Sequence, residues 1–116
     1  MPAVEVPNKF FTRINTSAKS GDFSLILDLF IPQAVMEWTL KGPMKFNGPE
    51  LIVDALKQMT KGCTFVVSEP ASTGNIVAVN FDMYAGGKQT PAAQGTATFT
   101  VTEKDKISEL KVVPRP

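Results

Sequence analysis

The second half of the chain alternates between apolar and polar residues over four segments, and this pattern restricts the fold more than any other feature. Residues 63–69, 76–84, 94–102 and 107–113 each place apolar side chains at every second position, which is the spacing of a strand with one buried face. The links between these segments are hairpin-like and rich in turn-forming residues. The sequence therefore predicts an antiparallel sheet in this half of the chain.

Three segments of the first half carry apolar residues at helical spacing. Residues 7–20 form the first predicted helix, which Gly21 ends, and residues 22–30 form the second, which ends before Pro32. Residues 47–60 open with Asn-Gly-Pro-Glu, a helix start with a proline in the first turn and an early acid. The predicted buried faces are Phe10, Phe11, Ile14 and Ala18, then Phe23, Ile26, Leu27 and Phe30, then Leu51, Ile52, Ala55, Leu56 and Met59.

One further strand is predicted between the second and third helices. Residues 34–40 alternate, with Met36, Trp38 and Leu40 on the apolar face. The order is helix, helix, strand, helix and four strands, with no internal repeat or linker. We therefore expect a single α+β domain over residues 1–116, in which a strongly curved antiparallel sheet wraps over three helices around an apolar pocket.

Composition excludes several classes of partner. The 116 residues include 12 basic and 11 acidic side chains, so no strong field exists to recruit nucleic acid or an anionic membrane. No apolar run is long enough to span a bilayer, and the first residues do not form a secretion signal. The single cysteine, Cys63, cannot form an internal disulfide. Together these features favour a cytoplasmic protein without nucleic-acid or membrane partners.

The absence of histidine limits the chemistry. Histidine is the commonest general base near neutral pH and a common metal ligand, and serine or cysteine nucleophiles usually depend on it. Any acid–base chemistry must use Asp, Glu, Lys, Tyr or a bound cofactor. The sequence itself predicts neither a metal site nor a cofactor.

In order and spacing, the elements resemble the nuclear transport factor 2-like superfamily, in its SnoaL-like and ketosteroid-isomerase-like branch. The resemblance covers about residues 7–113. It rests on Ser20-Gly21-Asp22-Phe23, the following Leu25-Ile26-Leu27-Asp28-Leu29-Phe30 and Pro32-Gln33-Ala34-Val35, Asn47-Gly48-Pro49-Glu50-Leu51-Ile52, Phe99-Thr100-Val101 and Lys106-Ile107-Ser108-Glu109-Leu110. It implies a cone-shaped sheet, an apolar or aromatic small molecule as ligand, and a homodimer formed through the outer face of the sheet.

The catalytic residues of ketosteroid isomerases do not carry over to this chain. Their aspartate base follows a glutamate that matches Glu37, but Trp38 stands in the aspartate's place. The tyrosine donor falls near Ile14 and the partner aspartic acid near Ala97. Steroid isomerisation is therefore not expected. The histidines of scytalone dehydratase are also missing, and the residues of the epoxide hydrolases find no convincing match.

Trp38 is the best candidate for a pocket residue, because it occupies the family's catalytic strand position. Its ring could stack on a flat ligand or fill the cone, and the sequence leaves both open. The phenylalanines and methionines whose side chains are predicted to point inward could also either line a pocket or pack in the core. The predicted ligand contacts are Trp38, Met36, Ile14, Phe65, Phe81, Met83 and Phe99.

Asp82 and Tyr84 are the tentative catalytic residues, on a polar stripe with Asn80. If the stripe faced the cavity, Asp82 could act as a base and Tyr84 could donate to an oxyanion. The opposite face of that strand is more apolar, which favours a stripe that faces solvent or a partner.

Two functions stay open at this point. One is a SnoaL-like isomerase, cyclase or lyase that uses a carboxylate. The other is a non-catalytic ligand carrier or dimerisation module whose cavity its own side chains fill. An open cavity with a buried carboxylate would favour the enzyme. A cavity closed by Trp38 and the phenylalanines would favour the non-catalytic carrier or dimerisation module. The threonines at 96, 98, 100 and 102 form either a dimer interface or a solvated face.

Overall fold

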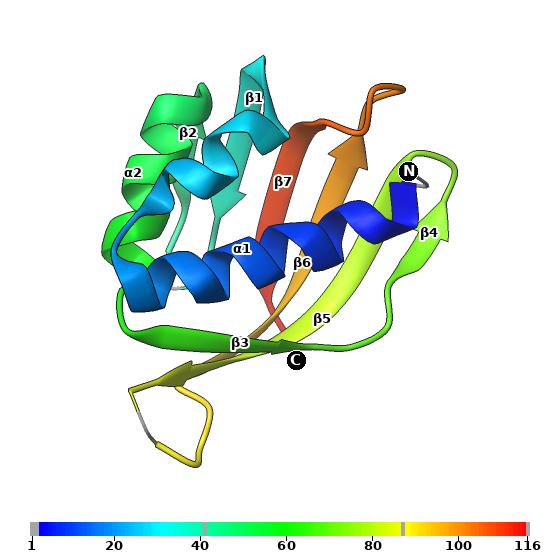
Figure 1. Cartoon of the computed structure of the whole chain (residues 1–116). Helices are drawn as coiled ribbons and strands as arrows, with labels where there is room; N and C mark the ends of the chain where they lie inside the picture. Colours follow the sequence, from blue (N-terminus) through cyan, green and yellow to red (C-terminus); the bar gives the residue numbers. More distant parts are fainter. Residues whose placement is uncertain (1–2, 41, 87, 116) are drawn as a thin grey trace.

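The computed structural model describes residues 3–40, 42–86 and 88–115. Figure 1 shows the three longer helical segments on one side of a curved sheet. The helical segments are η1 (Ala3–Glu5), α1 (Val6–Ser20), η2 (Phe23–Leu29) and α2 (Pro49–Thr60). The strands are β1 (Phe30–Trp38), β2 (Met44–Asn47), β3 (Cys63–Val67), β4 (Ala71–Thr73), β5 (Ile76–Ala85), β6 (Ala93–Val101) and β7 (Ile107–Pro114). None of the helices in these ranges is long and apolar enough to cross a bilayer.

The strands form one sheet in the order β2-β1-β7-β6-β5-β3, and β4 pairs with part of β5. The predicted α+β class and the curved sheet are confirmed. The sheet is mixed rather than wholly antiparallel, because β1 and β7 run parallel. These two strands are separated by most of the chain rather than by a hairpin, so no tight turn forces them to run in opposite directions.

The second predicted helix is shorter and of a different type. Phe23–Leu29 forms a 3₁₀ helix, and β1 begins at Phe30 instead of after Pro32. The proline is tolerated in β1 because the ladder to β7 shifts register between Phe30 and Val35. In a 3₁₀ helix residues three apart align, so Phe23, Ile26 and Leu29 are buried while Leu27 is exposed.

Asp22 caps this 3₁₀ helix. The hydroxyl and the backbone N–H of Ser24 both donate to Asp22 Oδ1, at 2.6 Å and 3.0 Å. These two hydrogen bonds stabilise the carboxylate, and they lower the pKa of Asp22 below its ordinary value of 3.8. The predicted cap is therefore present, although the helix that it begins is 3₁₀.

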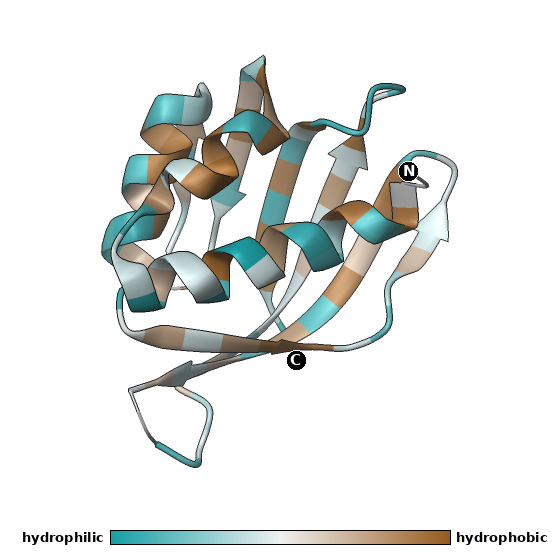
Figure 2. Cartoon of the chain, viewed as in Figure 1, coloured by the Kyte–Doolittle hydropathy of each residue, from teal (hydrophilic) through white to brown (hydrophobic). Residues whose placement is uncertain are grey.

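The inner face of the sheet packs against α1 through phenylalanine rings. Phe10 and Phe11 of α1 lie with their ring centroids 5.2 Å and 6.0 Å from that of Phe99. Phe11 also contacts Phe65 and Phe81, at 5.3 Å and 5.8 Å. Figure 2 shows hydrophobic residues alternating with hydrophilic ones along β5, as expected for a strand with one buried face. The rings fill the interior of the cone.

One polar side chain fastens α1 to the edge of the sheet. Asn15 Nδ2 donates to the carbonyl oxygen of Phe65 at 3.0 Å, and Asn15 Oδ1 accepts from the N–H of Phe65 at 2.7 Å. These are the only hydrogen bonds between α1 and the sheet in the part of the chain that the structure describes. The amide thus satisfies both backbone groups of an edge residue, as a neighbouring strand would.

Asn15→Ala is expected to destabilise the protein by about 1–3 kcal/mol, because it leaves two half-buried backbone groups of Phe65 unpaired. Urea unfolding measures the loss. Thr12→Ala, one turn earlier on α1 and exposed, is the control and is expected to change the stability by less than about 0.5 kcal/mol. Equal stabilities of the two variants would contradict the role of Asn15.

Among the glycines that the structure describes, Gly95 is the one whose missing side chain makes room for the core. A Cβ atom there would lie 2.7 Å from Phe81 Cζ, its cross-strand partner, and 2.8 Å from the carbonyl oxygen of Val113. Both distances are shorter than a carbon contact allows, and the carbonyl belongs to the neighbouring strand. Gly95 is therefore required for the ring of Phe81 to lie flat against the sheet.

Gly95→Ala is expected to destabilise the protein by about 1–3 kcal/mol through overpacking. The sign of this stability change is informative, because replacing a glycine by alanine inside a strand would otherwise be stabilising. Thermal unfolding with Thr98→Ala as the control, on the same strand but on the outer face, measures the difference. A melting temperature at or above that of the wild type would show that the strand absorbs the extra carbon.

Candidate functional site

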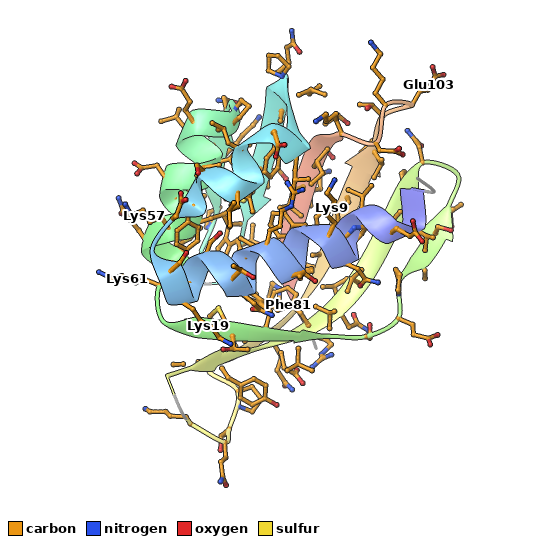
Figure 3. The ribbon with its side chains drawn as sticks, in the orientation of Figure 1. Lys9, Lys19, Lys57, Lys61, Phe81 and Glu103 are labelled. Carbon is orange, nitrogen blue, oxygen red and sulfur yellow. The ribbon has the colours of Figure 1, made fainter. Side chains whose placement is uncertain are left out.

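The curvature of the sheet brings all seven predicted ligand contacts together in the core. Their side chains are each exposed by 7% or less. They come from α1, β1, β3, β5 and β6. Figure 3 shows Phe81 inside the fold beside α1, whereas Lys57 projects from α2. Five hollows are described on this molecule, and none of them is lined by these seven residues. Their role as ligand contacts stays a prediction.

None of the acidic or basic side chains in residues 3–40, 42–86 and 88–115 is buried in the interior of the cone. Ser17 and Thr60 are the only buried polar side chains among the described residues. Thr60 Oγ1 donates to the carbonyl oxygen of Leu56 at 2.6 Å, and Ser17 Oγ has no hydrogen-bond partner. Within the same residues, no group of three His, Cys, Asp or Glu side chains could hold a metal ion. The core offers packing, not proton transfer.

Asp82 and Tyr84 lie on the outer face of the sheet, because Phe81 and Met83 occupy the inner face of β5. Asp82 Oδ1 accepts from Arg115 Nη2 at 2.5 Å and from the Gln94 side chain at 3.0 Å. The backbone N–H of Arg115 donates to the carbonyl oxygen of Gln94. Asp82 therefore holds the C-terminal segment against β6, and its carboxylate points away from the cone.

The outer face collects the other polar candidates in rows across the strands. Glu37 of β1 lies beside Lys111 of β7, which in turn lies beside Thr98 of β6. Asn80 Oδ1 accepts from Thr96 Oγ1 at 2.7 Å. The threonines of β6 therefore lie at the centre of the polar outer face of the sheet, as their alternation predicts.

An apolar hollow lies where η2, β1 and the start of α2 meet, and we refer to it as the α2 groove. Its volume is about 580 Å³. It is lined by Leu27, Phe30, Pro32, Asn47, Gly48, Pro49, Glu50 and Leu51. The sequence assigned Leu27 and Leu51 to buried helical faces, yet they are 39% and 58% exposed. The signal that could have revealed the groove is the apolar character of these two leucines together with the prolines that flank them.

The exposed large apolar side chains fall into two groups. Leu25, Leu27, Met44 and Leu51 belong to η2, β2 and α2. Val66, Ile76 and Val113 belong to β3, β5 and β7, on the outer face of the sheet. Clusters of exposed apolar side chains often mark interaction sites, so both surfaces are candidates.

Comparison with known proteins places the chain in a family. The model of the SnoaL-like domain matches residues 8–110. The chain belongs to the SnoaL-like family. This confirms the resemblance found in the sequence. No match was found among curated proteins.

Solved structures agree on the fold of this SnoaL-like protein. A putative isomerase of the SnoaL-like family from Agrobacterium tumefaciens is 16% identical, with a TM-score of 0.79 over 100% of each chain. An NTF2-like protein of unknown function from Cytophaga hutchinsonii is 18% identical, with a TM-score of 0.77 over 100% of this chain and 92% of that one. A de novo designed protein with a curved β-sheet is 20% identical, with a TM-score of 0.76, over 100% and 89%. Because a designed protein shares the fold, the fold alone carries no activity.

Proposed function

We propose that this SnoaL-like protein is a non-catalytic carrier of an apolar or aromatic small molecule, and that the molecule lies in the α2 groove. One observation carries the proposal: the cone is filled by its own aromatic rings, while an apolar hollow of about 580 Å³ lies beside it. Small-molecule sites usually have volumes of roughly 300–1,000 Å³ and mostly apolar linings.

The absence of a paired acid and base supports carriage over catalysis. Glu50 is the only titratable side chain that lines the groove, and it is exposed. Isomerase, cyclase or lyase chemistry needs a general base together with a donor that stabilises the developing charge. Asp82 and Tyr84 would have to supply them, and both face the opposite side of the sheet. The isomerase assignment of the Agrobacterium relative is therefore not extended to this chain.

The lining of the groove supports an apolar ligand. Leu27, Phe30 and Leu51 provide aliphatic and aromatic surface from three elements. Pro32 and Pro49 restrict the backbone on two sides, so the shape is largely set before a ligand arrives. The polar groups are few, which suits orientation of the ligand rather than reaction.

Leu27→Lys is expected to weaken binding of N-phenyl-1-naphthylamine, an uncharged aromatic probe, by roughly tenfold or more, because a charge replaces apolar lining. Titration of the probe's fluorescence measures the dissociation constant. Leu25→Lys is the matched control, since Leu25 is 41% exposed on the same 3₁₀ helix but does not line the groove. Its affinity is expected to equal that of the wild type.

Three other results would each contradict part of this proposal. No binding to the wild type would remove apolar carriage. Equal loss in both lysine variants would remove the groove as the site. A probe that shifts the indole N–H resonance of Trp38, the only tryptophan, and still binds Leu27→Lys would place the ligand at the seven predicted residues of the cone.

A second function is favoured by the outer face of the sheet, namely assembly as a homodimer. Val66, Ile76 and Val113 are exposed there around the row of β6 threonines. The β-branched side chains of this surface suit face-to-face packing of two sheets, and its charged residues include oppositely charged pairs such as Glu109 with Lys111 and Asp82 with Arg115.

Thr98→Arg is expected to convert a dimer to a monomer, because two guanidinium groups would meet across a two-fold axis at the centre of this face. Light scattering after size exclusion measures the mass. Thr12→Arg, on the exposed face of α1, is the control and should keep the mass of the wild type. A wild-type protein that has the mass of one chain at high concentration would rule out the dimer.

A further inference from the structure

The two edge strands of the sheet differ in how far their backbone groups are covered. An edge strand carries a row of N–H and C=O groups that can pair with another strand. The path through the sheet ends at β2 on one side and at β3 on the other. At β3, α1 lies across the edge and Asn15 occupies both backbone groups of Phe65. This edge is closed to a further strand.

The β2 edge is open. The N–H of Gly48 donates to the carbonyl oxygen of Ala34, which continues the antiparallel ladder between β1 and β2. In such a ladder the bonded pairs alternate, so Met44 and Phe46 bond to β1 while the backbone groups of Lys45 and Asn47 point outward. No group in the described part of the chain pairs with these outward groups.

Beside this edge runs a second hollow, which we name the β2–α2 groove. It has a volume of about 310 Å³ and is lined by Met44, Phe46, Leu51, Asp54, Ala55, Gln58 and Met59. Leu51, Ala55 and Met59 are spaced four residues apart on α2, so they form one stripe along the groove. A strand added beyond β2 would direct every second side chain onto this stripe.

The charge of the groove indicates which strand fits. Asp54 lines the groove and is exposed, and it forms no ion pair with a described residue. Met44 and Leu51 provide apolar surface, 38% and 58% exposed. The complement is an extended segment with apolar side chains at alternate positions and basic residues beside them.

We propose that the β2 edge, with the β2–α2 groove, binds an extended peptide segment of a partner protein by strand addition. The outward groups of Lys45 and Asn47 supply main-chain hydrogen bonds. The stripe on α2 receives the apolar side chains, and Asp54 attracts a basic one. This interaction is independent of the small molecule proposed for the α2 groove, although the two hollows share Leu51.

The test uses a capped peptide of alternating valine and threonine with a lysine at each end. At about 90% saturation, the amide hydrogens of Lys45 and Asn47 are expected to exchange roughly tenfold more slowly, because only the free fraction exchanges. The same peptide with a central proline should give no protection. Protection of other amides only would overturn the proposal.

A matched pair of substitutions isolates the main-chain contact. Lys45→Pro and Lys45→Thr both remove the charge, but only the proline removes the outward N–H. Proline is tolerated on an edge strand whose N–H faces solvent, and melting curves check that both variants fold. Lys45→Thr should keep the affinity, and Lys45→Pro should lose roughly tenfold or more. Equal affinities would overturn strand addition.

Two further outcomes concern the partner. Asp54→Asn should lower the affinity for the peptide that ends in lysine and leave the affinity for a serine-ended version unchanged. An unchanged affinity for the lysine-ended peptide would overturn the charge assignment. If Lys45 and Asn47 are protected without peptide, in proportion to protein concentration, then a second copy of this chain occupies the edge and the peptide assignment is wrong.

Discussion

The contact between α1 and the inner face of the sheet is the interaction on which the rest of this structure depends. Phe10 and Phe11 of the helix contact phenylalanine rings on β3, β5 and β6. One helix near the start of the chain therefore packs against three strands from its second half. Gly95 leaves room for the ring of Phe81, and Asn15 forms hydrogen bonds that join the helix to β3 at the edge of the sheet. Removing any of these would loosen the curvature that places both grooves.

The core of the cone is built of aromatic rings, and both proposed binding sites lie at the surface. The fold of its relatives hosts different activities, and a designed protein shares it, so function has to be argued from particular sites. The interior contains aromatic rings and no titratable side chain in its described part. The apolar surface that remains accessible lies around α2, where η2 and β2 flank the helix, and on the outer face of the sheet.

Much of the fold and little of the candidate site could be predicted from the sequence. Alternation separated Val77, Val79, Phe81 and Met83 from the polar face of β5, because a strand has a period of two whatever its neighbours are. It favoured this apolar face as the inner one without deciding it, and the structure buries it. Helical spacing gave a wrong prediction for Leu27, because over seven residues it does not distinguish an α-helix from a 3₁₀ helix. Leu51 was assigned to the buried face of α2, but the residues buried there are Ile52, Leu56 and Thr60, so this face is narrower than predicted and leaves Leu51 exposed.

The sequence by itself determined the class of fold, the alternation of the strands, the third helix and its proline start, and the absence of histidine chemistry. These follow from periodicity, backbone restrictions and composition, which are local. Only the tertiary structure decided that β1 runs parallel to β7, that Asp82 holds Arg115, and that the cone is filled while the groove beside α2 is not. Each of these depends on residues far apart in the chain, and whether a face becomes a pocket or a core depends on the volume of the side chains that meet there.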